Sequence, residues 1–558
     1  MSTEHYGLIS RREFLLLAGA TTGALAIDWV GLKALAAKIG PKKELPVVVI
    51  GGGLGGLSAA AILARQGFPV TLVEQHDRPG GYATAFERGA GRFSFDVSLH
   101  ATSGVSGGPM REVFKEAGIL NKVEMVELPD LCRIITPDHD MVWPQRNPEA
   151  IIDQLSKTFP GEANGIRDFF DEILDIIDEA MKPFDPNSWW DRIIFPITHG
   201  RMWAIRDKTL ANVLDTHVRD AKLRSILSVF WGYYGLPPSK LSGFLYAVAT
   251  ASSIRFGGYY VKPRSQDLSY ALMDAIEEAG GRVLLETEAV GITMKEGTVS
   301  GVALKGGRNI KAKAVISNAS VPATMKMLPQ EALSSPSSDK TPNYLKKLST
   351  YRPSLSTFIV WLGLNREIRG KVKGYEIFAG ENHDPEESYQ GCLTCDPKRS
   401  GIAVTIYDNA YPGYSRPGTS TVTVMMLSGY APWRRFEADY LAGRKEAYLQ
   451  EKARITEELI DQAEKLVIPG LREMIEVKES ASPLTNLRYT KNPEGAIYGY
   501  EQSLDNAYMN RIKNTTPFKG LYLASAWGGD GGGYQPCLQA GLKAYMALIR
   551  DWGFEAQS

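Results

Sequence analysis

The sequence has few cysteines, no excess of charge of either sign and no long apolar run. Four cysteines in 558 residues are too few for a disulfide scaffold. Because 63 Lys and Arg balance 63 Asp and Glu, the chain lacks the basic excess typical of nucleic-acid-binding proteins, and we expect no nucleic-acid partner. No apolar run reaches the roughly 18 residues of a membrane-spanning helix. The 7 histidines are scattered without metal-ligand spacing, so we predict no metal site.

The composition is that of an ordinary folded protein. Hydrophobic residues make up 44% of the chain and charged residues 23%, which excludes a mainly disordered polypeptide. At about 150 residues per domain, the length is compatible with three or four domains.

An export signal is predicted at the N-terminus. The pair Arg11-Arg12 is followed by Phe14, by an apolar stretch of small residues up to Ile27, and by a small-x-small site at 34–36. This order is typical of a twin-arginine signal peptide, which we place at residues 1–36. It predicts a partnership with the twin-arginine export machinery, and a location in the periplasm or at the outer face of the inner membrane. The alternative is an ordinary amphipathic helix.

The strongest pattern is a strand, a glycine-rich turn, a helix and a second strand. Residues 47–50 and 70–73 are apolar and β-branched, as buried parallel strands require. Residues 57–66 are rich in Ala and Leu and predict a helix between them. A G-x-G-x-x-G motif fills residues 51–56, between the first strand and the helix. This order predicts a dinucleotide-binding domain.

The glycines of this motif have separate roles. Gly51 permits a tight turn, Gly53 lets the backbone approach a pyrophosphate, and Gly56 lets the helix pack against the strand. Gly55 belongs to the same turn at the helix N-terminus, where free N–H groups and the positive end of the helix dipole favour phosphate. Glu74 follows the second strand and can accept hydrogen bonds from ribose hydroxyls.

Four further segments carry a resemblance to a known family. They are the pair Gly80-Gly81, the hexapeptide Phe-Asp-Val-Ser-Leu-His at 95–100, the segment 257–268 and the glycine-rich segment 520–533. In this order they resemble the flavin amine oxidase and phytoene desaturase superfamily. The hexapeptide is most similar to carotenoid desaturases, carotenoid cis-trans isomerases and retinol saturases. The sequence departs from many relatives at Tyr82, where they have Arg.

The resemblance implies FAD as the cofactor and an α/β fold. A Rossmann-like FAD-binding domain of the amine oxidase type would be assembled from the discontinuous segments 45–110, 251–334 and 481–558. An α+β domain for substrate binding, or a lid, would take residues 111–250 and 335–480.

The resemblance also implies residues that contact the cofactor. Besides the glycine turn and Glu74, these are Gly80, Gly81, Val290, Gly529, Asp530 and Gln535, with the Val290 backbone at the adenine. Reducing an alkene needs a proton donor as well. The candidates by position are His100, Tyr259, Tyr498, Tyr500, Glu501 and Asp530. For His100 a structural hydrogen bond is an equal alternative, and Asp530 could instead bind the ribityl chain or cap a turn.

These features predict an exported FAD-dependent oxidoreductase. It would saturate, desaturate or isomerise C=C bonds in a long apolar isoprenoid or polyene, by hydride transfer at the flavin N5 atom. The sequence holds a single G-x-G-x-x-G unit, so we expect a quinone or another electron partner in place of NAD(P)H. The alternatives are a flavin amine oxidase, and a non-catalytic flavoprotein that transfers electrons or binds a lipid.

Two segments leave alternatives open. Residues 189–196 place aromatic and aliphatic side chains close to Arg201 and Arg206, which suits either a membrane interface or a lid helix packed on its own domain. Cys392 and Cys395 could form a disulfide or remain free thiols.

Overall fold

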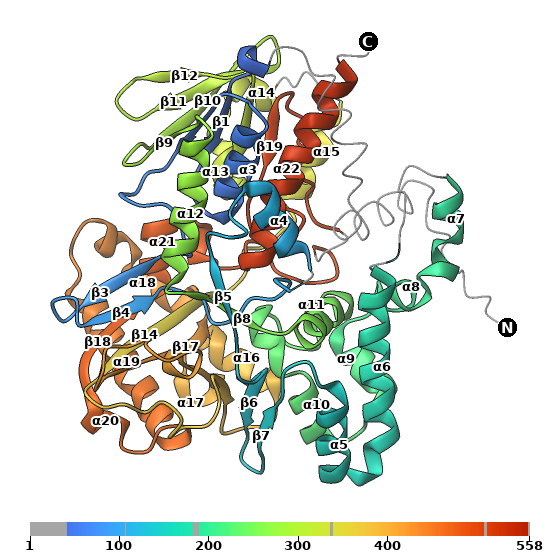
Figure 1. Cartoon of the computed structure of the whole chain (residues 1–558), viewed down its shortest axis with the longest axis vertical. Helices are drawn as coiled ribbons and strands as arrows, with labels where there is room; N and C mark the ends of the chain where they lie inside the picture. Colours follow the sequence, from blue (N-terminus) through green and yellow to red (C-terminus); the bar gives the residue numbers. More distant parts are fainter. Residues whose placement is uncertain are drawn as a thin grey trace.

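The computed structural model describes residues 42–106, 108–180, 182, 189–334, 339–506 and 510–555. The predicted signal peptide, residues 1–36, lies outside these residues. Two large sheets and a helical cap dominate the described part of the chain, with three smaller sheets beside them (Figure 1). Within that part, no helix combines the length and the apolar character that crossing a membrane requires.

A five-stranded parallel sheet forms the core of one half of the molecule (Figure 1). Its strands, in spatial order, are β19 (Leu521–Leu523), β13 (Ala314–Ser317), β1 (Val47–Ile50), β2 (Val70–Val73) and β9 (Arg282–Leu284). The central strand β1 is buried over its whole length, which explains its continuous apolar run. The strands predicted at 47–50 and 70–73 are confirmed at those bounds.

Layers of secondary structure cover both faces of this sheet. On one face pack α3 (Leu54–Arg65), α4 (Pro109–Ala117), α12 (Ser265–Glu278) and α22 (Tyr534–Glu555). On the other lie a meander of β10 (Ala289–Lys295), β11 (Thr298–Leu304) and β12 (Asn309–Lys311), with α13 (Val321–Lys326), α14 (Gln330–Ser334) and α15 (Thr341–Leu348). The result is a doubly covered α/β layer.

Helix α3 begins three residues before the helix that the sequence predicts. Its first turn contains two glycines. A Cβ atom on Gly55 would lie 2.0 Å from the Ala524 carbonyl oxygen, and one on Gly56 would lie 2.1 Å from the Gly51 carbonyl oxygen. Only glycine permits this approach of helix and strand ends.

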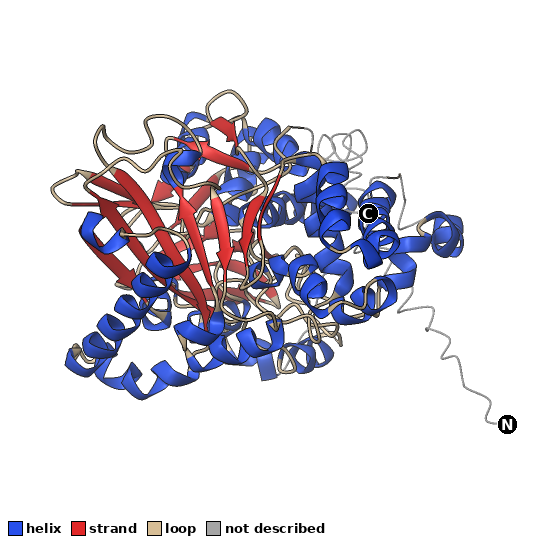
Figure 2. Ribbon diagram, turned by 90° about the horizontal axis from the view of Figure 1, so that it is seen from below, coloured by secondary structure: helices blue, strands red, loops and turns tan. Residues whose placement is uncertain are grey.

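A seven-stranded mixed sheet forms the other half. Its order is β18 (Ile475–Ala481), β14 (Ser356–Leu364), β17 (Ser420–Ser428), β16 (Ile402–Ile406), β15 (Glu376–Ala379), β6 (Cys132–Ile135) and β7 (Asp140–Trp143). One face packs against a helical layer that includes α19 (Glu446–Leu466). The other helices of this half are α16 (Pro385–Thr394), α17 (Pro397–Ser400), α18 (Ala431–Leu441), α20 (Leu471–Met474) and α21 (Pro483–Thr490). Figure 2 shows the strands side by side with helices around them.

A helical cap with its own core adjoins the larger sheet. It contains α5 (Pro148–Thr158), α6 (Ala163–Ala180), α7 (Trp189–Thr198), α8 (Gly200–Ile205), α9 (Leu210–His217), α10 (Ala221–Leu227), the 3₁₀ helix η3 (Val229–Tyr233) and α11 (Gly243–Phe256). The domain boundaries that the sequence suggests stay a prediction, although the five-stranded sheet does take its strands from 45–110, 251–334 and 481–558.

Two small strand pairs connect the halves. They are β3 (Ala85–Arg88) with β4 (Phe93–Asp96), and β5 (Glu124–Glu127) with β8 (Tyr259–Lys262).

Asp96 ends β4 and is completely buried. Its carboxylate accepts hydrogen bonds from the Ser265 backbone N–H at 3.0 Å, from the Ser265 hydroxyl and from the Tyr260 hydroxyl. Its backbone carbonyl accepts one from the Trp361 indole N–H at 2.7 Å. One residue therefore ties α12, β8 and β14 together.

We predict that Asp96→Ala destabilises the protein strongly. The change leaves the buried donors on Ser265 and Tyr260 without their acceptor, which costs on the order of 3 kcal/mol. Urea unfolding of the purified variant measures this loss. Asp439→Ala is the matched control, because this exposed carboxylate pairs only with Arg444 at the surface and its loss should cost roughly 0.5 kcal/mol or less. Equal unfolding free energies for the two variants would contradict the prediction.

Candidate functional site

A cavity of about 1190 Å³ lies between the two sheets. Sites for one small ligand usually measure about 300–1,000 Å³, so this one has room for more than one molecule. One end is lined by the loops that follow β1 and β2, and the other by the face of β14, by Tyr233 at the end of η3 and by Tyr498.

The first end brings together six residues that the sequence predicts to contact a dinucleotide: Gly51, Gly53, Glu74, Gly80, Gly81 and Val290. The Glu74 carboxylate accepts the Gly52 backbone N–H at 2.6 Å and the His76 backbone N–H at 2.9 Å. Both bonds hold this side chain beside the glycine turn. The Gly80 backbone N–H donates to the Gly52 carbonyl at 2.7 Å, which closes the second glycine segment over the first.

Glycine is required in this cradle for steric reasons. A Cβ atom on Gly53 would lie 2.4 Å from Asn318 Oδ1, and one on Gly80 would lie 2.3 Å from the Ala83 carbonyl oxygen. Gly53 is also the N-cap of α3, and it offers no side chain to the first N–H groups of that helix. The backbone is therefore open to a ligand at the positive end of a helix, which suits a pyrophosphate.

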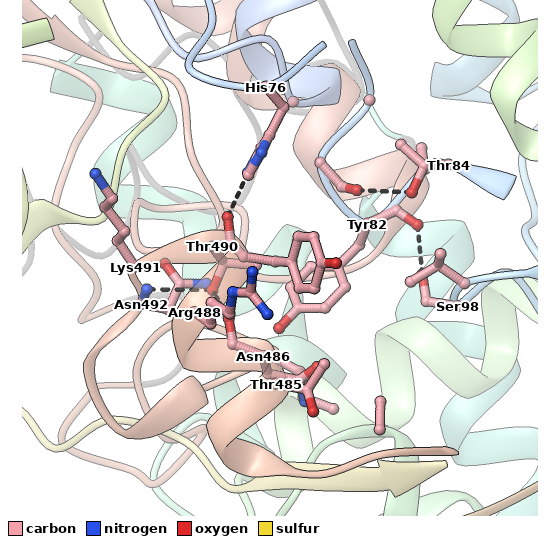
Figure 3. Close-up of a pocket in the computed structure, with 18 of the residues that line it drawn as sticks. His76, Tyr82, Thr84, Ser98, Thr485, Asn486, Arg488, Thr490, Lys491 and Asn492 are labelled. Carbon is pink, nitrogen blue, oxygen red and sulfur yellow. Dashed lines mark hydrogen bonds between the residues drawn. The ribbon is translucent and has the colours of Figure 1, made fainter. Parts of the chain in front are cut away.

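Further along, Tyr82 and α21 form facing walls of the cavity (Figure 3). The Ser98 hydroxyl donates to the Tyr82 carbonyl at 3.0 Å, and the Thr84 hydroxyl donates to the Gly81 carbonyl at 3.1 Å (Figure 3). Opposite them, His76 Nε2 lies 2.6 Å from the Tyr489 carbonyl oxygen. The Tyr82 hydroxyl is buried without a hydrogen-bond partner of good geometry, although Thr490 lies beside it, so it can offer a hydrogen bond to a ligand.

Tyr498 lines the cavity, and so does His100, the imidazole candidate among the predicted proton donors. Its Nδ1 lies 2.5 Å from the Thr405 hydroxyl oxygen, and its Nε2 is buried without a partner. Burial lowers the pKa of His100 to about 4, so the ring is neutral at neutral pH. It can exchange hydrogen bonds with a ligand, but it holds no extra proton to give.

The other predicted site residues lie outside the lining of this cavity: Gly55, Gly56, Tyr259, Tyr500, Gly529, Asp530 and Gln535. The hydroxyl of Tyr259 accepts a hydrogen bond from Arg146, and Tyr500 packs between Tyr351 and Trp527 with ring centroids 5.0 and 4.8 Å away. Their predicted roles in catalysis stay predictions.

Asp530 and Gln535 are held by partners of their own. Asp530 forms an ion pair with Lys543, and its charge also opposes the fall in the pKa of Arg511 that burial causes. The Oε1 atom of Gln535 accepts a hydrogen bond from the Ser103 hydroxyl at 3.0 Å.

Sequence reasoning missed the wall that β14 contributes. Thr357, Ile359 and Trp361 line the cavity, while Phe358 and Val360 between them pack into the core on the other side of the sheet. This alternation has the period of two that marks a strand with two different faces, and it is the signal that could have found the wall. Tyr233 also lines the cavity, and no motif in the sequence singles it out.

The cysteines and the acidic residues offer no further centre. Cys392 and Cys395 are buried free thiols in the structure, which answers the question that the sequence left open. In the described part of the chain, no group of three or more His, Cys, Asp or Glu is arranged to hold a metal ion.

Relatives with known names are similar over most of their length. All-trans-retinol 13,14-reductase of Danio rerio is 26% identical over 510 residues, covering 86% of this chain and 82% of that protein. Prolycopene isomerase 2 of an Oncidium hybrid cultivar is 24% identical over 538 residues, covering 95% and 88%. The 4,4'-diapolycopen-4-al dehydrogenase of Metabacillus indicus is 23% identical over 522 residues, covering 91% and 97%.

Solved structures share the fold. An oxidoreductase from Methanosarcina mazei aligns with a TM-score of 0.59 at 18% identity, covering 91% of this chain and all of that one (100%). Cyclohexylamine oxidase from Brevibacterium oxydans aligns with a TM-score of 0.56 at 16% identity, covering 92% and 100%. These structures support the α/β fold of a flavin amine oxidase that the sequence predicts.

The family is shown by a match along nearly the whole chain. A family model described as flavin containing amine oxidoreductase matches residues 54–548. This span includes the helix at the glycine turn, the cavity lining except Ile50, Gly51 and Gly53, and the C-terminal segment that the resemblance singled out. The chain belongs to the flavin-containing amine oxidoreductases, and it is an enzyme, an oxidoreductase that depends on FAD.

Proposed function

We propose that this oxidoreductase saturates, desaturates or isomerises C=C bonds in a long apolar isoprenoid or polyene. The observation that carries the proposal is the size and wall of the cavity. Beyond its dinucleotide end, Ile359, Trp361 and Met425 present apolar side chains to the same space. The relatives support it, because their names describe an all-trans-retinol 13,14-reductase, a prolycopene isomerase and a 4,4'-diapolycopen-4-al dehydrogenase.

The residues at the dinucleotide end fit FAD. The turn from Gly51 to Gly53 and the N-terminus of α3 would hold the pyrophosphate, and Val290 would lie at the adenine. Glu74 keeps unused lone pairs for a ribose hydroxyl although it already accepts two backbone N–H groups. When bound, the flavin accepts or supplies a hydride.

The chain has two further tasks. It must exclude water from the reacting bond, which the apolar wall of β14 favours, and it must hold or take a proton on the polyene side. The electron partner that we propose is a quinone or another carrier that is not NAD(P)H. This follows from the single G-x-G-x-x-G unit in the sequence.

The first prediction concerns the cofactor. Gly53→Val should abolish FAD binding, because a side chain here would displace Asn318 and fill the space at the start of α3. Absorbance of the purified protein measures bound flavin. Gly161→Val is the matched control, since no atom lies within 4 Å of a Cβ atom at that position, and it should keep the wild-type flavin content. Full flavin content in Gly53→Val would contradict the assignment.

The second prediction concerns the substrate class. The FAD-loaded protein, reduced with dithionite under anaerobic conditions, should change all-trans-retinol, prolycopene or a polyene from a membrane lipid extract. Mass spectrometry of the product separates a gain of two hydrogens from a change of double-bond geometry alone. Oxidised protein with a quinone tests the reverse direction. Hydrogen peroxide from amines, with every polyene unchanged, would favour an amine oxidase instead. Flavin that exchanges electrons while every candidate substrate stays unchanged would favour the non-catalytic alternative.

We also propose that α7 contacts a membrane surface. Trp190, Ile193 and Ile197 are spaced for one helix face, and they are 55%, 59% and 83% exposed. The helix lies at the outer edge of the cap, away from both sheets (Figure 1). Exposed apolar groups on one helix face gain free energy from burial at a lipid interface.

Replacing these three side chains with Ser should weaken binding to phospholipid vesicles by about tenfold or more, since each buried apolar side chain contributes roughly 1.5–3 kcal/mol. Co-sedimentation with vesicles measures the partition. Leu441→Ser is the control, because Leu441 is 63% exposed on a different part of the surface and should leave binding unchanged. Equal partition of the two variants would contradict the proposal.

We propose export by the twin-arginine route, to the periplasm or the outer face of the inner membrane. The support is the order of residues 10–36 in the sequence. Replacing both Arg11 and Arg12 with Lys should leave the protein in the cytoplasm, as fractionation of cells would show. Normal export of that variant would contradict the route.

A further inference from the structure

A buried carboxyl group lies on the cavity side of the larger sheet. Trp361 pairs with Thr423, Thr423 with Thr405, and Thr405 with Glu376, on four successive antiparallel strands. Residues directly opposite each other on such strands point to the same face of the sheet. Because Trp361 lines the cavity, Glu376 faces the same side.

Among the residues that the structure describes, no basic side chain pairs with Glu376. It is 2% exposed, and its Oε1 atom has no hydrogen-bond partner. The titratable groups around it are Tyr233 from η3, Cys132 from β6, Tyr498, the adjacent Tyr375, and Asp130. The Asp130 carboxylate accepts a hydrogen bond from the Tyr375 backbone N–H. All of these titratable groups are neutral or acidic. Burial raises the pKa of Glu376 to about 7; the Tyr233 hydroxyl opposes this rise, and Asp130 adds to it.

Tyr233 separates this carboxyl group from the cavity. It lines the cavity, and its ring lies 5.4 Å from that of Phe378, which is two residues from Glu376 and on the same face of β15. Its hydroxyl is buried without a hydrogen-bond partner of good geometry. Burial and the neighbouring Glu376 raise the pKa of Tyr233 well above its usual value, so the hydroxyl keeps its proton.

His100 is a competing proton-donor candidate beside these paired strand residues, and its chemistry is different. Its Nδ1 contacts the hydroxyl of Thr405, the residue paired with Glu376. Burial keeps its ring neutral at neutral pH, since its pKa is about 4. A neutral imidazole is a much weaker proton donor than an imidazolium, so His100 is better suited to orient a ligand than to protonate it.

We propose that Tyr233 is the catalytic proton donor to the polyene, and that Glu376 acts through Tyr233 as the positioning residue that holds a proton in reserve. The proposal rests on the proposed function and adds the residues that handle the proton. The sequence-based candidates did not include either of them.

Reduction of a C=C bond adds one hydride and one proton, so that atoms and electrons balance. When bound, reduced flavin would supply a hydride (one proton and two electrons) to one carbon, and the Tyr233 hydroxyl would give its proton to the other. The Glu376 proton passes to the Tyr233 oxygen, and the carboxylate then takes a proton from water. A quinol or another two-electron donor of the proposed function restores the reduced flavin. For desaturation the same proton moves the other way.

The first test needs no substrate. Infrared spectra of the FAD-loaded protein should contain the C=O stretching band of a protonated carboxyl group that Glu376→Gln removes. This band should disappear with a midpoint near pH 7 when the pH rises from about 5 to about 9. Glu172→Gln is the matched control, because the hydrogen bond from His217 lowers the pKa of Glu172 and leaves it ionised. That variant should keep the band.

The second test uses the anaerobic reaction with all-trans-retinol or prolycopene. Glu376→Gln and Tyr233→Phe should each slow it by about 100-fold or more, while bound flavin and the far-ultraviolet circular dichroism stay at wild-type values. Glu376→Gln should also abolish the pH dependence near pH 7, which a structural role alone would not change. Tyr545→Phe, which removes a hydroxyl from α22 outside the cavity, should react at the wild-type rate.

Each outcome decides the proposal. Loss of the band in Glu376→Gln together with slow reaction of both variants supports it. Absence of such a band, or wild-type rates in either variant, overturns it. If no polyene reacts with the wild-type protein, the proposed function fails, and the infrared titration alone decides whether Glu376 holds a proton beside the cavity.

Discussion

The buried carboxylate of Asp96 determines how the two sheets face each other. It accepts hydrogen bonds from the N-terminus of α12 and from β8, and its own carbonyl accepts one from Trp361 on β14. A buried carboxyl group in such a position costs free energy unless its oxygen atoms find hydrogen-bond partners, so it favours this one arrangement of these segments. The cavity exists because that arrangement leaves the glycine turns and the face of β14 opposite each other.

The cavity has two chemically different ends. At one end the backbone comes close to the ligand space, because Gly53 and Gly80 have no side chains and Glu74 is held by backbone N–H groups. At the other end β14 presents the apolar side chains of Ile359 and Trp361. A row of paired residues leads from Trp361 across the sheet, through two threonines, to Glu376. A cofactor with a polar dinucleotide and a flat ring, together with an apolar polyene, matches this order. The protonation state of Glu376, the titratable residue of this row, is then the variable that the protein controls.

Local patterns in the sequence predicted the parts of the site that neighbouring residues build. The strands at 47–50 and 70–73, the glycine turn and the position of Glu74 depend on a short segment and on its own periodicity. Tyr233 and Glu376 are 143 residues apart and meet only because β15 pairs between β16 and β6 while η3 packs over them (376 − 233 = 143). No local pattern encodes that pairing. Tyr259 shows the converse, since it lies in a segment that carries the family resemblance and yet contacts Arg146 and does not line the cavity.

The most direct test of the account is an experimental structure of the FAD-loaded protein. The account predicts the pyrophosphate at the turn formed by Gly51 and Gly53, and the flavin ring in the same cavity, within contact of the walls that carry His100 and Tyr233. An apolar additive or polyene would then occupy the space in front of Ile359 and Trp361. A flavin ring outside this cavity, or one that leaves no space between itself and β14, would contradict the central claim that cofactor and polyene share one site.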